Sequence, residues 1–244
     1  MRVSPLVGAG AVGAAGYAGY RLAMEPSNQT FGPVRFSGSG SARQCALTFD
    51  DGPNEPFTSE LADILASRGV KATFFQVGSA VARTPEVTRR LLADGHVIGN
   101  HSLTHTFGRC FRGSDLRVEV GETQAILTDV IGAVPALYRP PWLLRTPALF
   151  PVLESHGLTA VTGAFCHPLE VFQPNPEMIA ARARTQGARP GSIVIFHDGW
   201  DGRGGNRAST VEAAKRTVDT LLEQGVEFVT VDRLLGLEAY RPVA

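Results

Sequence analysis

Two short stretches of the sequence carry side chains that can bind a metal ion. The stretch LTFDDGP ends an apolar run with two adjacent carboxylates, Asp50 and Asp51. The stretch HSLTH carries two histidines four residues apart, His101 and His105. On one turn of helix, side chains at this spacing project from the same side and can meet one ion. One carboxylate of the aspartate pair would complete a site of two histidines and one aspartate, with positions open for water and substrate.

This donor set indicates which metal to expect. Two imidazoles and one carboxylate suit Zn²⁺, or another divalent transition metal such as Co²⁺, better than Mg²⁺ or Ca²⁺, which prefer oxygen ligands. A metal with an open position lowers the pKa of water toward about 7, which favours hydrolysis, and the second aspartate is then free to act as base. Adjacent anions repel each other unless a cation lies nearby. The metal and Arg139 are the candidates for that cation.

The chain that must position these residues alternates between short apolar runs and segments with helical spacing. The apolar runs predict strands at residues 45–49, 72–77, 96–100, 136–139, 158–165, 192–196 and 226–231. Strands that alternate with helices favour a parallel sheet with helices outside it. The pattern fits both a closed barrel and an open, doubly wound sheet.

In both architectures, functional side chains gather at the carboxyl ends of the strands. The polar residues found there are Asp50, Asp51, Asn100, His101, Arg139, His197 and Asp198. Taken singly, each has a structural explanation, such as a turn for aspartates before Gly-Pro. Their shared position after strands favours an active site instead.

Composition narrows the function classes. Lysine and arginine together number 23 of 244 residues, and so do aspartate and glutamate, so the chain lacks the basic surface of a nucleic-acid binder. The spacing of Cys45, Cys110 and Cys166 excludes a CxxC motif. We interpret the cysteines as small buried residues, although one disulfide with a free thiol fits the count as well. The oligomeric state is left open.

The amino-terminal residues 1–24 form an apolar segment. Residues 3–20 carry no charge and are about long enough to cross a bilayer as a helix. A basic start before an apolar run also fits a secretory signal, although no clear A-x-A cleavage site follows it. We expect a signal peptide or a membrane anchor, rather than a disordered cytoplasmic extension, and therefore an exported protein that is membrane-anchored facing outside or secreted to the cell wall. Residues 25–40 are predicted to be a linker.

The motifs resemble those of the polysaccharide deacetylases with a NodB-homology domain, carbohydrate esterase family 4. The matching stretches are TFDDGP at 48–53, HSLTH at 101–105, RPPW at 139–142 and IVIFHD at 193–198. The resemblance covers about residues 41–236 and leaves residues 237–244 as a tail. It implies an α/β fold, a distorted (β/α)7-type barrel.

The resemblance also implies a role for each matching residue. Asp50 is implied as the catalytic base, with Arg139 orienting it and holding it ionised, and His197 as the general acid. The implied metal ligands are Asp51, His101 and His105. The backbone N–H of Trp142 is implied as a donor to the oxyanion of the transition state. The residues expected to contact the sugar are Pro141, Trp142 and Trp200.

The implied reaction is metal-assisted hydrolysis of N-acetyl groups on an acetylated amino-sugar polymer or oligomer, chitin-like or peptidoglycan, which leaves acetate and an amine. Two features depart from the family pattern. The Asp-Trp pair expected after the fifth strand is replaced by Val171-Phe172, with Glu170 and His167 as the nearest polar residues. Without a carboxylate partner, His197 is expected to be less basic. Leu143 stands where a glycine is common.

These departures keep two other functions open. One is a carbohydrate-binding relative with weakened catalysis, which the missing Asp-Trp pair motivates. The other is a deacylase of a small or lipid-linked acylated sugar. The enzyme is favoured over the binding protein because every residue needed for metal binding and water activation is present.

Overall fold

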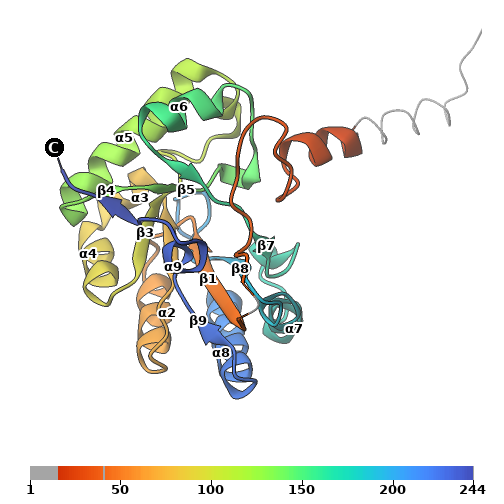
Figure 1. The fold of residues 1–244 in the computed structure, drawn as a ribbon. Helices are drawn as coiled ribbons and strands as arrows, with labels where there is room; N and C mark the ends of the chain where they lie inside the picture. Colours follow the sequence, from red (N-terminus) through yellow and green to blue (C-terminus); the bar gives the residue numbers. More distant parts are fainter. Residues whose placement is uncertain (1–15, 41, 244) are drawn as a thin grey trace, which may run out of the picture.

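The computed structural model describes residues 16–40 and 42–243 of the chain. Its centre is one curled sheet (Figure 1) whose strands, in spatial order, are β6 (Thr159–Ala160), β5 (Leu137–Tyr138), β3 (Val97–Asn100), β2 (Thr73–Gln76), β1 (Gln44–Asp50), β8 (Ser192–His197) and β7 (Ala164–Phe165). Every pairing between neighbours in this order is parallel. A short strand, β9 (Glu227–Phe228), pairs in parallel with the amino end of β1.

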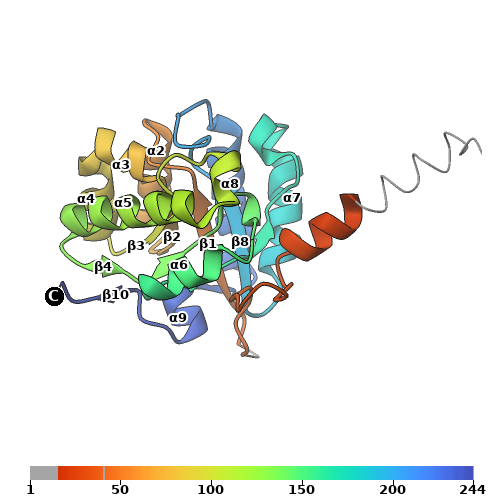
Figure 2. The same cartoon turned by 90° about the horizontal axis from the view of Figure 1, so that it is seen from above.

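Helices flank the sheet, as Figure 2 shows from a second direction. They are α2 (Phe57–Ala66), α3 (Gly78–Arg83), α4 (Pro85–Ala93), α5 (Gly113–Ile131), α6 (Leu149–Ser155), α7 (Pro176–Gly187), α8 (Ala208–Glu223) and α9 (Val231–Leu235). Short 3-10 helices are η1 (Phe107–Cys110), η2 (Pro141–Leu143) and η3 (Glu170–Phe172). An antiparallel pair, β4 (Val134–Pro135) and β10 (Tyr240–Arg241), forms a separate small sheet. This architecture confirms the predicted distorted (β/α)7-type barrel.

The central strand β1 is buried, and large apolar side chains pack around its Phe49. The ring of Phe49 lies 5.0 Å from the ring of Phe74 on β2 and 5.7 Å from that of Phe196 on β8. Leu61 of α2 and Leu221 of α8 belong to the same buried cluster. Burial of large side chains supplies most of the stability of such a core and fixes where the carboxyl end of β1 lies.

Two predicted strands differ from the structure. The run 158–165 divides into β6 and β7 because the chain turns between them, and a Cβ at Gly163 would lie 2.7 Å from the backbone oxygen of Ile193. The run 226–231 gives only the two-residue β9, and Val231 already begins α9. The backbone N–H of Val231 donates a hydrogen bond to the hydroxyl of Thr73 on β2 at 3.0 Å, which ties the first residue of α9 to the sheet.

Part of the expected linker packs on the barrel. Arg35 forms a parallel bridge with Val161, and Ser37 forms an antiparallel bridge with Ser192. Val34 is buried in a second apolar cluster. Residues 34–37 therefore line the side of the sheet between the end of β6 and the start of β8.

The structure describes only part of the predicted signal or anchor at the amino terminus. Most of the expected signal or anchor falls on residues 1–15, outside the described residues, and residues 16–23 are helical. Within the described ranges, none of the helices has the length and apolar character that crossing a membrane requires. The three cysteines are free and buried, as we expected, and burial raises the pKa of Cys45 and Cys110 to about 12.

Candidate active site

The loops at the carboxyl ends of β1, β3 and β8 enclose a cavity of about 270 Å³. The sequence-predicted residues on its wall are Asp50, Asp51, His101, His105, Trp142, His197 and Trp200. Arg139 is fully buried and contacts Asp50 instead of lining the cavity. Pro141 is also buried and does not line the cavity, whereas its neighbour Pro140 does.

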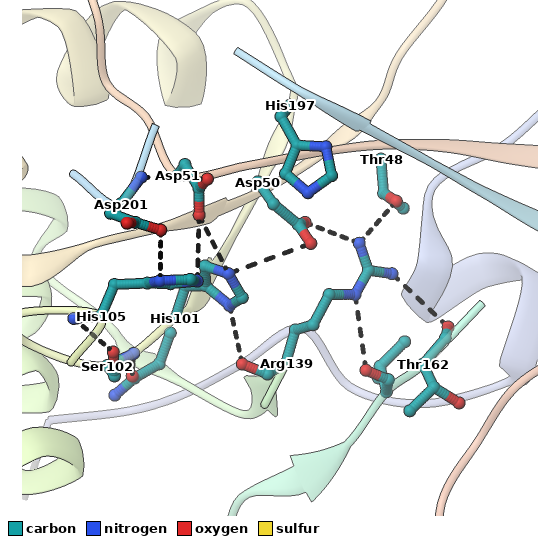
Figure 3. Close-up of polar contacts among 12 residues, drawn as sticks. Thr48, Asp50, Asp51, His101, Ser102, His105, Arg139, Thr162, His197 and Asp201 are labelled. Carbon is teal, nitrogen blue, oxygen red and sulfur yellow. Dashed lines mark hydrogen bonds and ion pairs between the residues drawn. The ribbon is translucent and has the colours of Figure 1, made fainter. Parts of the chain in front are cut away.

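Three buried residues bring metal-binding atoms together at this cavity (Figure 3). Oδ1 of Asp51 lies 3.3 Å from Nε2 of His101 and 3.3 Å from Nε2 of His105. A tetrahedral ion with bonds of about 2.0–2.1 Å holds its ligand atoms roughly this far apart. Within the described residues, this oxygen of Asp51 has no hydrogen-bond donor. The set therefore fits a divalent transition metal.

The turn after β1 explains how adjacent aspartates can both reach the cavity. Asp50 is the last residue of the strand, whereas Asp51 has a φ of 76° and has left the strand. Neighbouring side chains on a regular strand would point to opposite faces. The left-handed backbone at Asp51 redirects its carboxylate toward the histidines.

The two histidines converge through a loop, and our prediction of a helical turn for HSLTH is wrong. Ser102 and His105 have φ values of 69° and 52°, which no helix contains. The hydroxyl of Ser102 accepts a hydrogen bond from the backbone N–H of His105 at 3.1 Å. The side-chain oxygen of Asn100 accepts a hydrogen bond from the backbone N–H of Ser102 at 3.0 Å. Buried Glu119 of α5 accepts the backbone N–H groups of residues 103 and 104. These local polar contacts replace the helix as the source of the geometry.

The Nδ1 atom of each histidine has its own partner, which leaves Nε2 facing Asp51. Nδ1 of His101 lies 2.7 Å from the backbone oxygen of Arg139, so it carries the proton and donates. Nδ1 of His105 lies 2.8 Å from Oδ1 of Asp201. Asp201 was not among the site residues predicted from the sequence, although it is the second aspartate of the stretch HDGWDG at the end of β8.

The charges of the cluster shift its pKa values. Burial raises the pKa of the Asp51 carboxyl, but the facing imidazoles of His105 and His101 lower it overall, well below its usual range. Burial lowers the pKa of His105, but Asp51 and Asp201 raise it overall. The site is thus built to hold positive charge beside Asp51.

Asp50 is held by a buried arginine, Arg139, which directly follows β5. Nη1 of Arg139 donates to Oδ1 of Asp50 at 2.7 Å and to the hydroxyl of Thr48 at 2.6 Å. The guanidinium lies 4.1 Å from the ring centre of Phe75. Burial lowers the pKa of Arg139, and the charge of Asp50 opposes that shift. The arginine therefore fixes one carboxylate oxygen, while Oδ2 lies 4.0 Å from Nε2 of His101.

His197 has a carboxylate partner, so the expectation that it lacks one is wrong. Its Nδ1 lies 2.7 Å from Oε2 of Glu170, which is 1% exposed, and the Thr210 hydroxyl donates to the other oxygen of Glu170. Burial lowers the pKa of His197, but Glu170 outweighs this effect and raises the pKa to about 9. Glu170 lies in η3, one residue before the position where the alignment had found Val171.

Aromatic side chains form the rim of the cavity. The ring of Trp142 lies 4.2 Å from that of His105 and 5.3 Å from that of Phe107. Trp142 and Leu143 have φ values of 52° and 56°, a conformation that favours glycine, which gives a physical reason for the glycine common at position 143 in the family pattern. Trp200 also lines the cavity and is 44% exposed.

Comparison with known proteins gives similarities in sequence and in fold. A family model described as polysaccharide deacetylase matches residues 37–161. A peptidoglycan-N-acetylglucosamine deacetylase of Bacillus cereus is 31% identical over 216 residues, which are 88% of this chain and 97% of that protein. A chitooligosaccharide deacetylase of Bradyrhizobium sp. is 35% identical over 176 residues, which are 71% of this chain and 78% of that protein.

Solved structures share the fold. The Bc1960 peptidoglycan N-acetylglucosamine deacetylase has a TM-score of 0.77 and 27% identity, over 85% of this chain and 95% of that one. A structure described as a CE4 family pseudoenzyme from Bacillus anthracis has a TM-score of 0.73 and 20% identity, over 83% of this chain and 68% of that one. At that identity the likeness shows the fold alone, so catalysis has to be inferred from the residues of the site.

Proposed function

This chain belongs to the polysaccharide deacetylase family, carbohydrate esterase family 4, and we propose that it is a metal-dependent hydrolase that removes N-acetyl groups from N-acetylglucosamine units of peptidoglycan or a chitin-like polymer. The observation that carries the proposal is the convergence of Asp51, His101 and His105 beside the carboxylate of Asp50. The names of the similar proteins, peptidoglycan and chitooligosaccharide deacetylases, support the substrate class. Because peptidoglycan and chitin lie outside the cytoplasm, we also propose that the protein is exported.

The metal would be held by Asp51, His101 and His105, and Zn²⁺ or Co²⁺ suits this donor set. When bound, it supplies Lewis-acid polarisation of the acetyl carbonyl and of the attacking water. Asp50 acts as the base that takes a proton from that water, and Arg139 keeps its carboxylate oriented through the 2.7 Å contact.

His197 acts as the general acid. As the water oxygen bonds to the acetyl carbon, the carbon–nitrogen bond breaks and the amine of the sugar needs a proton, which His197 delivers. Glu170 keeps the ring oriented and protonated, because its carboxylate lies at Nδ1. The products are acetate and a glucosamine unit with a free amine.

The rim of the cavity supplies binding and stabilisation. The backbone N–H of Trp142 donates to the oxyanion that forms on the acetyl oxygen, a use to which preorganised backbone donors are suited. Trp142 and Trp200 both line the cavity, and their rings provide apolar surface for the faces of sugar rings. The carbohydrate-binding alternative rested on a missing carboxylate beside His197, and Glu170 removes that reason.

The proposal is tested by acetate release from acetylated chitooligosaccharides and from peptidoglycan with added Zn²⁺ or Co²⁺. Asp50→Asn keeps the shape of the side chain but removes the base, so we expect activity to fall by about 10²–10⁴-fold. Asp129→Asn is the matched control, because Asp129 is exposed on α5. Equal activity of the Asp50 variant and the wild type would reject the assigned base, and no release from any acetylated sugar would reject the function.

A further inference from the structure

We infer that Asp201 is a positioning residue that holds two of the three proposed metal ligands at once and thereby sets the metal affinity of the site. This inference rests on the proposed function, because it concerns the same metal site. The carboxylate of Asp201 contacts the ring of His105, and its backbone N–H contacts the carboxylate of Asp51. One residue outside the ligand set therefore orients two ligands.

The two contacts act on complementary atoms (Figure 3). Oδ1 of Asp201 lies 2.8 Å from Nδ1 of His105, an ion-pair contact without the alignment of a hydrogen bond, and Nε2 of His105 faces Oδ1 of Asp51 at 3.3 Å. The backbone N–H of Asp201 donates to Oδ2 of Asp51 at 3.1 Å, which leaves Oδ1 as the free ligand oxygen. Both contacts favour the single arrangement in which the ligand atoms point at one position.

The other histidine of the site shows what is special about this partner. His101 is oriented by a neutral backbone oxygen, that of Arg139, whereas His105 is oriented by a carboxylate. A carboxylate at the far nitrogen makes a ligating imidazole more basic, and removal of such a partner weakens metal binding by about 10–100-fold. The charge of Asp201 thus acts on metal affinity through His105.

The loop that carries Asp201 is anchored independently of the histidine. The side-chain amide of Asn54 donates to the backbone oxygens of Asp198 and Gly205, at 2.9 and 2.8 Å, and Arg83 donates to the backbone oxygen of Gly202. Gly199 packs so closely that a Cβ there would lie 2.3 Å from the backbone oxygen of Asp51. The loop is therefore fixed against the turn after β1, which makes Asp201 a preorganised support.

The experiment measures Zn²⁺ affinity by competition with a chromophoric chelator, using the full chain freed of metal. Asp201 has a φ of 47°, so Asp201→Gly removes the carboxylate while tolerating the backbone conformation. We expect this variant to bind Zn²⁺ about 10–100-fold more weakly than the wild type. Asp201→Asn keeps an oxygen acceptor without the charge, so its loss should be smaller, roughly threefold to tenfold. Asp129→Asn should bind as the wild type does.

The outcomes separate this inference from the proposed function. If the wild type binds Zn²⁺ and both Asp201 variants bind it equally well, the inference is overturned and the proposed function stands. If the wild type binds neither Zn²⁺ nor Co²⁺, the proposed function fails and the inference with it. Should Asp201→Gly not fold, the Asn variant decides, and wild-type affinity in that variant overturns the inference.

Discussion

The candidate active site contains two histidine–carboxylate pairs with similar distances and different proposed roles. Nδ1 of His105 lies 2.8 Å from a carboxylate oxygen of Asp201, and Nδ1 of His197 lies 2.7 Å from one of Glu170. The contact of His197 is a hydrogen bond that leaves its Nε2 free, whereas His105 and Asp201 form an ion pair without hydrogen-bond alignment. The first pair lies at the proposed metal site, and the second lies at the end of β8.

What lies near the second nitrogen distinguishes the pairs. Nε2 of His105 is 3.3 Å from Oδ1 of Asp51, so it shares an ion with that oxygen in the proposed site. For His197, no second carboxylate of the described residues lies within 4.0 Å, and its ring stacks on Phe165 at 6.0 Å. These surroundings suit His105 to its proposed role as a metal ligand and His197 to its proposed role as the general acid.

The largest expected effect comes from breaking the first pair at the histidine. His105→Ala removes a proposed metal ligand, and a catalytic metal contributes several kcal/mol to transition-state stabilisation, so activity should fall by roughly 10³-fold or more. Zinc content after dialysis, measured together with acetate release, checks both consequences. His156→Ala is the control, since His156 lies outside the cavity. A variant that keeps bound zinc and activity would contradict the ligand assignment.

Breaking the second pair at the carboxylate should change the pH dependence more than the maximum rate. The wild-type pKa of His197 is raised to about 9 by Glu170. In Glu170→Gln the largest contribution that raises the pKa is lost, while Asp51 and Asp50 still raise it, so we expect the pKa of His197 to fall well below 9. A general acid must be protonated, so we expect the variant to lose about 10–100-fold activity near pH 8 and much less near pH 5.5. A pH–rate profile with an unshifted basic limb would show that Glu170 does not control the acid.

The same variant sharpens the comparison through stability. Because the folded-state pKa of His197 is raised, the pair contributes to the free energy of unfolding fully below about pH 6.5, and this contribution is lost as pH rises through about 9. The difference in Tm between wild type and Glu170→Gln should therefore shrink across that range. Thr210→Val serves as a milder companion, because it removes only the hydroxyl that donates to Glu170.

The sequence predicted the residues that end strands, but it offered Glu170 only as a nearby polar residue and did not indicate Asp201. Asp50, His101 and His197 follow apolar runs, and the carboxyl ends of parallel strands must meet, so their proximity could be inferred. Asp201 and Glu170 lie in irregular segments without periodicity, where no pattern fixes which way a side chain points. The contacts of Asp201 and Glu170 with the histidines could be identified only from the fold.

The helical turn predicted for HSLTH fails for a related reason. Spacing by four is compatible with a helix, but the left-handed residues Ser102 and His105 and the acceptor Glu119 create a loop with the same convergence. Side-chain acceptors that satisfy backbone N–H groups compete with helical hydrogen bonds. The prediction of one shared metal ion therefore does not depend on the predicted helical turn, since three possible ligand atoms converge without it.

The smallest expected effect concerns the rim next to the first pair. Trp200 precedes Asp201 in the same loop, and its ring centre lies 6.3 Å from that of Phe172 and 5.3 Å from Cζ of Arg207. Trp200→Ala should therefore raise KM for chitooligosaccharides about threefold to tenfold, the loss of roughly 1 kcal/mol of aromatic packing, with kcat nearly unchanged. Trp200→Phe should restore most of the affinity. If kcat falls and zinc binding weakens in Trp200→Ala, the ring supports Asp201 rather than the sugar, and the rim and the metal site are one structural unit.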